Sequence, residues 1–168
     1  MAVGLITDNL LPRKIAWELV QEVLSKNSRL DYQLSSRLNH HSLKSQDKRF
    51  ITELVKGSIR MKGRMQWELK QIYSGNYDKL NPSLLSLLYI GAYQIKFMNG
   101  IPDYAAVSTS VDLSRKINPR VNKLVNALLR KYSLLNIQSP KIDQTPDDWQ
   151  EWASHPKWLI DKWKKQWG

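Results

Sequence analysis

Hydrophobic residues recur at spacings of three and four along most of this chain, and no segment alternates convincingly between apolar and polar residues. Spacings of three and four place apolar side chains on one face of an α-helix, whereas strict alternation is typical of a half-buried strand. The pattern therefore predicts an all-α protein whose core is built from helices.

The first predicted helix covers residues 12–25, because Pro12 suits a first turn, where its missing N–H is not needed. This start places Arg13 and Lys14 in the same turn, where the helix dipole disfavours cations. Two cations at an unfavourable position indicate either a functional contact or a solvated surface. The apolar face of this helix consists of Ile15, Ala16, Leu19, Val20, Val23 and Leu24.

Two further helices are predicted before residue 63. Ser28 with Asp31 resembles a capping box ahead of a helix that ends near Asn39. Ser45 is the expected N-cap of the next helix, which reaches about Lys62.

Two glycines in this region have structural consequences. Gly57 lies inside the third helix, where it costs about 1 kcal/mol relative to Ala, so we expect a close contact between helices there. Gly63 precedes another periodic segment, residues 64–73, and we expect it to kink or break the helix.

The most apolar segment is a helix that begins after Asn81, its expected N-cap, with Pro82 at the first helical position. Asn99 and Gly100 are expected to end it. Apolar residues lie around most of its circumference, which is typical of a helix buried on all sides. They are Leu84, Leu85, Leu87, Leu88, Ile90, Ala92, Ile95 and Phe97.

Two more helices complete the predicted core. Asp103 is the expected N-cap of the first, with its inward face formed by Tyr104, Val107 and Val111. The second starts at Asn118-Pro119, and its apolar stripe consists of Val121, Leu124, Val125, Leu128, Leu129 and Tyr132.

The character of the chain changes after Leu135. Residues 136–148 have a linker composition, with prolines among polar residues, and Pro156 opens a final helical pattern. The last 20 residues hold five of the seven tryptophans. Such an aromatic segment either packs back on the helical core or contacts a partner module.

Composition narrows the class of protein. Lys and Arg outnumber Asp and Glu by 26 to 15, a net charge of +11 that favours polyanions, and first of all nucleic acid, as partners. The chain has no cysteine, which excludes disulfides, thiolate metal sites and thiol nucleophiles. No signal peptide or membrane-spanning run is evident, so we expect a soluble, cytoplasmic protein without a membrane partner.

Catalytic and metal-binding patterns are missing from the sequence. His40, His41 and His155 do not have the spacing of metal ligands, and no Gly-rich phosphate loop follows a strand. We therefore assign no catalytic, cofactor-binding or metal-binding residue to these 168 residues, and we expect them to have no enzyme activity of their own.

Basic residues cluster in two stretches. Residues 44–70 hold eight of them with three acids, whereas residues 115–131 hold six and no acid. Lys123 and Arg130 lie opposite the apolar stripe of the last core helix, and Arg120 and Lys131 flank the stripe. Cations in such a row suit a phosphate backbone, since each neutralised phosphate releases counterions. The alternative is an ordinary solvated face.

Several separated motifs resemble the NusB-like helical domain. They are Leu88-Tyr89-Ile90-Gly91-Ala92-Tyr93-Gln94-Ile95, Ile101-Pro102 before Ala105-Ala106-Val107, and Val125-Asn126-Ala127-Leu128-Leu129-Arg130. Asp47-Lys48-Arg49, Glu53 to Arg60 and Ser154-His155-Pro156-Lys157-Trp158-Leu159 are similar to one branch in particular, the N-terminal domain of the ribosomal RNA small-subunit methyltransferases B.

The resemblance implies two three-helix subdomains and an RNA-binding role. It implies a 16S ribosomal RNA cytosine-C5 methyltransferase as the full-length protein, with S-adenosylmethionine as cofactor and its catalytic domain downstream. Residues 1–135 would be the NusB-like domain, and 136–168 the linker that docks on the catalytic domain through its tryptophans. Arg13 and Lys14 match the basic start of the first helix, which contacts RNA in NusB. Together with Lys123, Arg130 and Lys131 they form the expected RNA-binding set.

The sequence departs from the family pattern at two positions. Tyr89 stands where the family often has Arg, so we expect no RNA-contacting cation from the middle helix. Leu124 stands where NusB proper has an aromatic residue. Two other functions remain open. One is a stand-alone antitermination factor that binds RNA and a ribosomal protein, and the other is a protein-docking scaffold. A homodimer is compatible with each.

Overall fold

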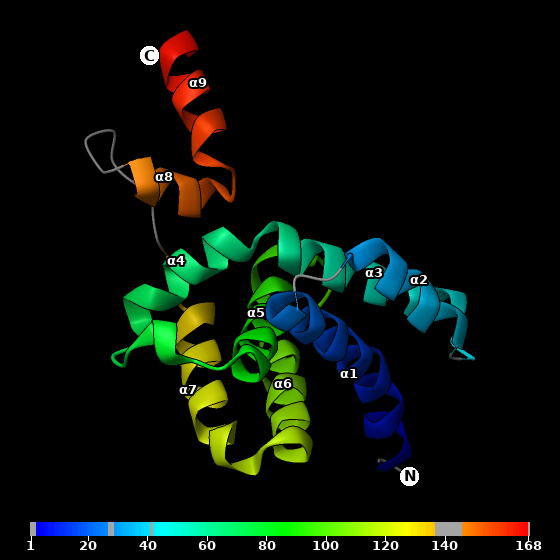
Figure 1. Cartoon of the computed structure of the whole chain (residues 1–168). Helices are drawn as coiled ribbons and strands as arrows, with labels where there is room; N and C mark the ends of the chain where they lie inside the picture. The colour runs from blue at the N-terminus through cyan, green and yellow to red at the C-terminus, as the bar shows by residue number, and fades with distance from the viewer. Residues whose placement is uncertain (1–2, 27–28, 41, 137–145, 168) are drawn as a thin grey trace.

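The computed structural model describes residues 3–26, 29–40, 42–136 and 146–167, which are helical apart from short connections (Figure 1). Within these ranges no strand occurs, and the all-α prediction is confirmed. The α-helices are α1 Val3–Lys26, α2 Leu30–His40, α3 Ser45–Arg60, α4 Lys62–Ile72, α5 Pro82–Phe97, α6 Asp103–Ile117, α7 Asn122–Ser133, α8 Pro146–Ala153 and α9 Lys157–Trp167. Two 3-10 turns, η1 Tyr77–Lys79 and η2 Pro119–Val121, precede α5 and α7.

Helix α5 is the centre of the molecule, as its apolar circumference predicts. It packs against α1, α3, α4, α6 and α7, and its middle turns are fully buried. The Asn81 side chain caps it by accepting a hydrogen bond of 2.8 Å from the Leu84 N–H. The helix ends at Phe97, and Gly100 takes a positive φ of 85° in the turn that follows.

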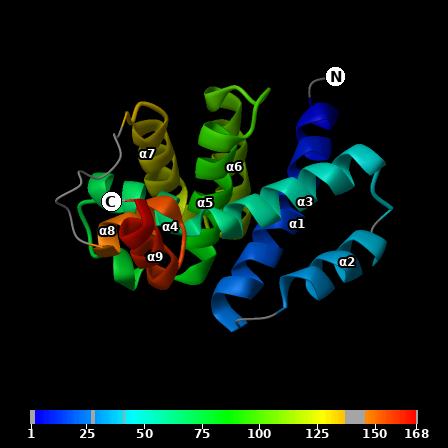
Figure 2. The same ribbon diagram turned by 90° about the horizontal axis from the view of Figure 1, so that it is seen from above.

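Two groups of helices pack around α5: α1 with α2 and α3, and α6 with α7. In Figure 2, α1, α2 and α3 lie to the right of α5, and α7 lies to its left. Gly57 of α3 allows a close approach to α5, because a Cβ there would lie 1.9 Å from the Tyr93 ring. The close helix contact expected at Gly57 is confirmed.

The start of α1 differs from the prediction. The helix begins at Val3 rather than at residue 12, so Pro12 lies inside it. An internal proline lacks one backbone donor and disturbs the preceding turn. Here Leu10 and Ile15 are both buried in the core on either side of it, and packing of that kind can outweigh the local preference for a break. Arg13 and Lys14 are therefore mid-helix residues and do not oppose the dipole at a helix start.

Two predicted N-caps are also wrong by one residue. Lys44 and Pro102 occupy the cap positions of α3 and α6, and Ser45 and Asp103 are the first helical residues. Neither cap position has a side-chain hydrogen bond, but Asp103 still places a carboxylate in the first turn, where the dipole favours it. Ser28 lies outside the described residues.

The break predicted at Gly63 falls two residues earlier, at Met61, where α3 gives way to α4. Gly63 instead lies where α8 approaches α4, since a Cβ there would be 2.9 Å from the Glu151 carbonyl oxygen.

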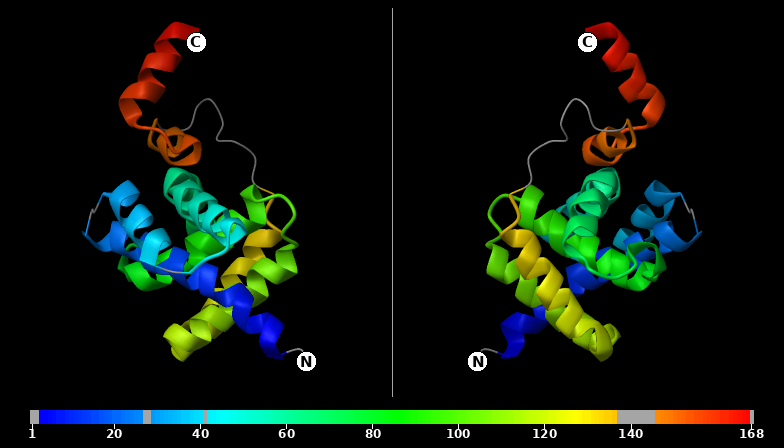
Figure 3. Two further views of the ribbon diagram at one scale, coloured as in Figure 1. Left: turned by 90° about the vertical axis from the view of Figure 1, so that its right-hand side faces the viewer. Right: turned by 90° about the vertical axis from the view of Figure 1, so that its left-hand side faces the viewer.

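The first helix of the aromatic C-terminal segment packs back on the bundle. Helix α8 lies against α4, and α9 packs on α8 and extends away from the core helices (Figure 3). The linker predicted for residues 136–148 is wrong at its end, because α8 already begins at Pro146; residues 137–145 lie outside the described ranges. Of the helices described, none is long and apolar enough to span a bilayer.

Candidate nucleic-acid interface

The buried face of α7 fixes which of its residues face outward. Val125, Leu129 and Tyr132 are fully buried, and Leu128 nearly so. The approach to α5 is close, because a Cβ on Gly91 would lie 2.5 Å from Leu129 Cδ1. With one side of α7 held in this way, Lys123 and Arg130 are exposed on the other side, as predicted.

A groove of about 860 Å³ runs between α6 and α7. Val107 and Val111, both nearly buried, form its apolar floor. The other α6 side chains along it are Asp103, Tyr104, Ser108, Asp112 and Arg115. Those from α7 are Asn122, Lys123, Asn126, Arg130 and Ser133.

The cations of the groove differ in how far they are neutralised. The Arg115 guanidinium lies 2.7 Å from an Asp112 carboxylate oxygen. Lys123 and Arg130 form no ion pair with any residue in the described ranges. They are seven residues apart on one face of α7, a separation of about 10 Å. The groove therefore has an available positive charge at each end of its α7 wall, with the Asp103 carboxylate at the end nearer Arg130.

Lys131, the third predicted cation of α7, is exposed but does not line the groove. It follows Arg130 directly and so lies about 100° around the helix. It widens the basic surface beyond the groove.

Arg13 is placed inside the protein. Its side chain is 6% exposed, and its Nε donates to Gln94 Oε1 over 2.8 Å. Its guanidinium carbon lies 4.8 Å from the centre of the Phe50 ring, and burial lowers its pKa. A guanidinium held in this way packs α1 against α3 and α5, and phosphate cannot reach it in this structure.

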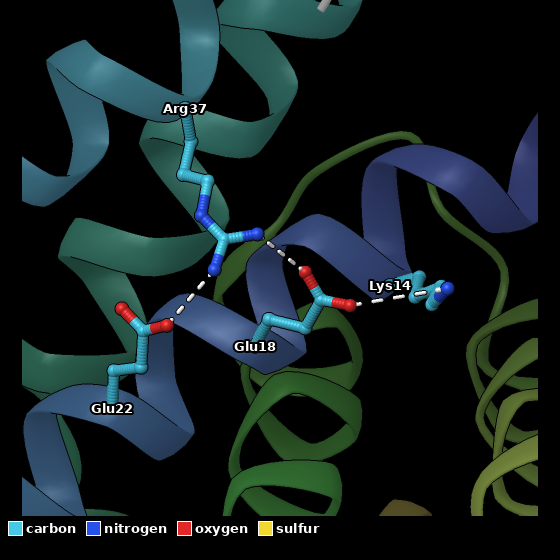
Figure 4. A network of polar contacts seen from close by, with 4 residues as sticks. All are labelled: Lys14, Glu18, Glu22 and Arg37. Atoms are coloured by element: carbon cyan, nitrogen blue, oxygen red, sulfur yellow. Dashed lines mark hydrogen bonds and ion pairs between the residues drawn. The ribbon is translucent and has the colours of Figure 1, made fainter. Parts of the chain in front are cut away.

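Lys14 is exposed and belongs to a surface network between α1 and α2 (Figure 4). Its Nζ lies 3.9 Å from Glu18, and Arg37 forms hydrogen bonds of 2.8 and 2.9 Å with Glu18 and Glu22. Because Arg37 holds Glu18 far more closely, Lys14 remains available to another anion. The structure thus separates Lys14 from Arg13, and it does not bring either into the α6–α7 groove.

Tyr104 is the residue that the sequence reasoning missed. It was expected to face inward, but it is 77% exposed and lines the groove. Val107 and Val111 are buried as predicted, and the other buried residues of α6 are Ala106, Ser110, Leu113 and Ser114, three of them small. The buried Ser110 hydroxyl donates a hydrogen bond of 2.8 Å to the Ala106 carbonyl oxygen. The sequence signal for this buried face is the spacing of four between Ala106, Ser110 and Ser114, because small residues allow α6 to approach α5 closely.

Two of the α4 cations, Arg64 and Lys70, form contacts within the protein, whereas Lys62 is exposed. The Arg64 Nε lies 2.6 Å from Glu68 Oε1, and its guanidinium carbon lies 4.3 Å from the Trp152 ring centre. The Arg64 backbone N–H also donates to Ser154 Oγ over 2.7 Å. Lys70 lies 3.2 Å from Glu151. These contacts dock α8 on α4.

Two further features of the described residues bear on the site. Tyr89 is 2% exposed and accepts a hydrogen bond of 3.2 Å from the Tyr77 hydroxyl. Nor do the described side chains include a group of three or more His, Cys, Asp or Glu arranged to hold a metal ion.

Comparison with known proteins gives two consistent results. A model of the NusB family matches residues 11–133. The chain is also 30% identical over 158 residues to a probable ribosomal RNA small subunit methyltransferase B of Synechocystis sp., an alignment that covers 93% of this chain and 35% of that protein.

Two other relatives have the same description. The chain is 27% identical over 160 residues to the probable enzyme of Bacillus subtilis, covering 93% of this chain and 35% of the relative. It is 25% identical over 156 residues to the ribosomal RNA small subunit methyltransferase B of Erwinia tasmaniensis, covering 92% and 35%. The chain thus spans about a third of the length of the curated relatives it matches.

Proposed function

The chain belongs to the NusB family, and on that premise we propose that it binds RNA through the outer face of α7, as the RNA-binding module of a methyltransferase that modifies small-subunit ribosomal RNA. The observation that supports this most directly is the pair of available cations, Lys123 and Arg130, at either end of the α7 wall of the groove. The names of the three relatives favour ribosomal RNA modification over transcription antitermination.

Phosphate binding follows from the charge pattern. Residues 115–131 carry six cations and no acid, and α7 displays three of its own on exposed positions. A separation of about 10 Å between Lys123 and Arg130 allows the two cations to contact different phosphates of one strand. We include Lys131 as a flanking contact and Lys14 as a separate contact on α1. We leave out Arg13 because its guanidinium is buried.

S-adenosylmethionine is the methyl donor that such an enzyme would use. The described residues do not fit it, since they form no strand and so none of the strand-to-helix turns at which parallel sheets hold nucleotides. We therefore assign these residues no role in methyl transfer. Their part is to hold and orient RNA.

The tryptophan-rich segment is a second contact in this proposal. Trp158 and Trp167 of α9 are largely exposed, and an apolar groove of about 460 Å³ lies between α8 and α9. We propose that this surface contacts the methyltransferase domain, while α8 holds it in a fixed position relative to α4.

A salt titration tests the RNA-binding proposal. The wild-type affinity for a labelled single-stranded RNA should fall steeply between about 50 and 200 mM salt, because counterions are released on binding. In a variant with Lys123, Arg130 and Lys131 all changed to Ala, the slope of log affinity against log salt should decrease by about three.

A matched control changes three other exposed cations, Lys26, Lys44 and Arg49, which lie on α1 and at the start of α3. This variant has the same net charge as the α7 variant and should keep nearly the wild-type slope. Equal losses in the two variants, or a wild-type affinity that does not change with salt, would refute binding through α7.

A further inference from the structure

The groove combines features that neither of its walls has alone. α6 and α7 are joined by the short turn η2 and lie side by side in opposite directions (Figures 1 and 3). The end of α6 that carries Tyr104 therefore faces the end of α7 that carries Arg130. The opposite end brings Arg115 to the side of Lys123.

Tyr104 is placed for a ligand with a flat apolar surface. A single exposed aromatic ring is common on proteins, and Tyr32 on α2 is equally exposed at 76%. Tyr104 differs because it shares one stripe of α6 with Val107 and Val111, the floor of a groove that also holds two available cations. Tyr32 does not line this groove.

Between the two cations the α7 wall is neutral and polar. Asn126 lies on this wall, and its amide can both donate and accept hydrogen bonds. A strand with phosphates near Lys123 and Arg130 would pass its bases along the amide and over the apolar floor. An aromatic ring at the end of such a path provides a stacking platform that any base can use.

We propose that the α6–α7 groove takes an unpaired RNA segment, with one base stacked on Tyr104 and the backbone held by Lys123 and Arg130. This inference rests on the proposed RNA-binding function and specifies which form of RNA it accepts. Bases inside a duplex are already stacked and paired, and the A-form major groove is too narrow for side chains to read. The groove therefore selects loops, bulges or single strands.

The test compares variants of the whole chain on two probes by fluorescence anisotropy. One probe is a labelled single-stranded RNA of about 12 nucleotides, within the range of single-strand site sizes. The other is the same strand annealed to its complement. Tyr104→Ala should weaken binding of the single strand by about fivefold or more and leave duplex binding nearly unchanged.

Two controls separate stacking from other effects. Tyr104→Phe keeps the ring and should bind the single strand like wild type. Tyr32→Ala removes an equally exposed ring outside the groove and should also bind like wild type. An affinity in Tyr104→Phe as low as in Tyr104→Ala would show that the hydroxyl is what matters and would overturn the stacking assignment.

The outcomes distinguish this inference from the broader proposal. If the triple α7 variant loses RNA binding while Tyr104→Ala does not, the RNA-binding function stands and the stacking site is refuted. Equal weakening of single strand and duplex by Tyr104→Ala refutes the selection of unpaired RNA. If wild type binds neither probe, both proposals fail, and the groove is better explained as a protein-docking surface.

Discussion

Helices α4 and α7 both carry basic residues from the two cationic stretches of the sequence, yet they use them in opposite ways. On α4, Arg64 and Lys70 are paired with Glu68 and Glu151. On α7, Lys123 and Arg130 have no ion-pair partner among the described residues and face a groove. The number of cations in a stretch of sequence therefore does not show how much positive charge is available to a ligand. That charge depends on which cations have a carboxylate at ion-pair distance.

The partners of α4 explain the difference. Glu68 is almost fully buried, so its charge must be compensated inside the protein. Arg64 provides that compensation on one oxygen, and the Tyr132 hydroxyl donates to the other. Burial, together with the Glu68 carboxylate, raises the pKa of Tyr132, which keeps this donor protonated. The inner face of α7 thus anchors it to α4, while the charge on its outer face remains available to a ligand.

The largest effect that the comparison predicts is the loss of Arg64. Arg64→Ala removes the cation opposite the buried Glu68 carboxylate and the contact with Trp152, so it should destabilise the fold by about 3 kcal/mol. The measurement is the midpoint of urea unfolding. The matched control is Arg115→Ala, whose pair with Asp112 is exposed and should cost no more than about 0.5 kcal/mol.

The RNA affinity of Arg64→Ala is a second measurement that complements its stability. Under conditions in which Arg64→Ala remains folded, its RNA affinity should stay close to wild type, because its charge is already neutralised. Equal stability of Arg64→Ala and wild type would show that the α4 pair is no stronger than a surface pair, and the contrast between α4 and α7 would then fail.

Sequence patterns predicted the parts of this fold that depend on local rules. The cap at Asn81, the buried circumference of α5 and the close contact at Gly57 all follow from helix geometry and side-chain size. The outward position of Lys123 and Arg130 also follows, since seven residues bring a helix back to nearly the same face.

The features that were missed depend on tertiary packing. Pro12 was read as a helix start, but the core contacts of Leu10 and Ile15 continue the helix through it. Tyr104 is predicted to face inward with Val107 and Val111, but it is 77% exposed, whereas the small residues Ala106, Ser110 and Ser114 are buried. The burial of Arg13 depends on Gln94, which is 81 residues away in the chain.

A smaller effect is expected for Arg13. Arg13→Ala removes the donor to the Gln94 carbonyl oxygen in the core and should cost about 2 kcal/mol, typical of a charged hydrogen bond. Its salt slope for RNA should match wild type. A compensating variant, Arg13→Met with Gln94→Leu, should recover part of the loss, because it removes the Gln94 acceptor together with its donor. A wild-type unfolding midpoint for Arg13→Ala, together with a reduced salt slope, would assign Arg13 to the RNA surface instead.

Lys14 should give the smallest change in stability. Its contact with Glu18 is exposed and long at 3.9 Å, so Lys14→Ala should alter the unfolding free energy by less than about 0.5 kcal/mol. If Lys14 is a phosphate contact, the same change should lower the salt slope for RNA by about one.

The matched control is Lys56→Ala, a similarly exposed lysine on α3 that lies 3.0 Å from Asp31. Lys56 already has a carboxylate at close range, so its loss should leave the slope unchanged. If both variants leave the slope unchanged, exposure without a close carboxylate is not enough to identify a phosphate contact, and the RNA surface is confined to the α6–α7 side of the molecule.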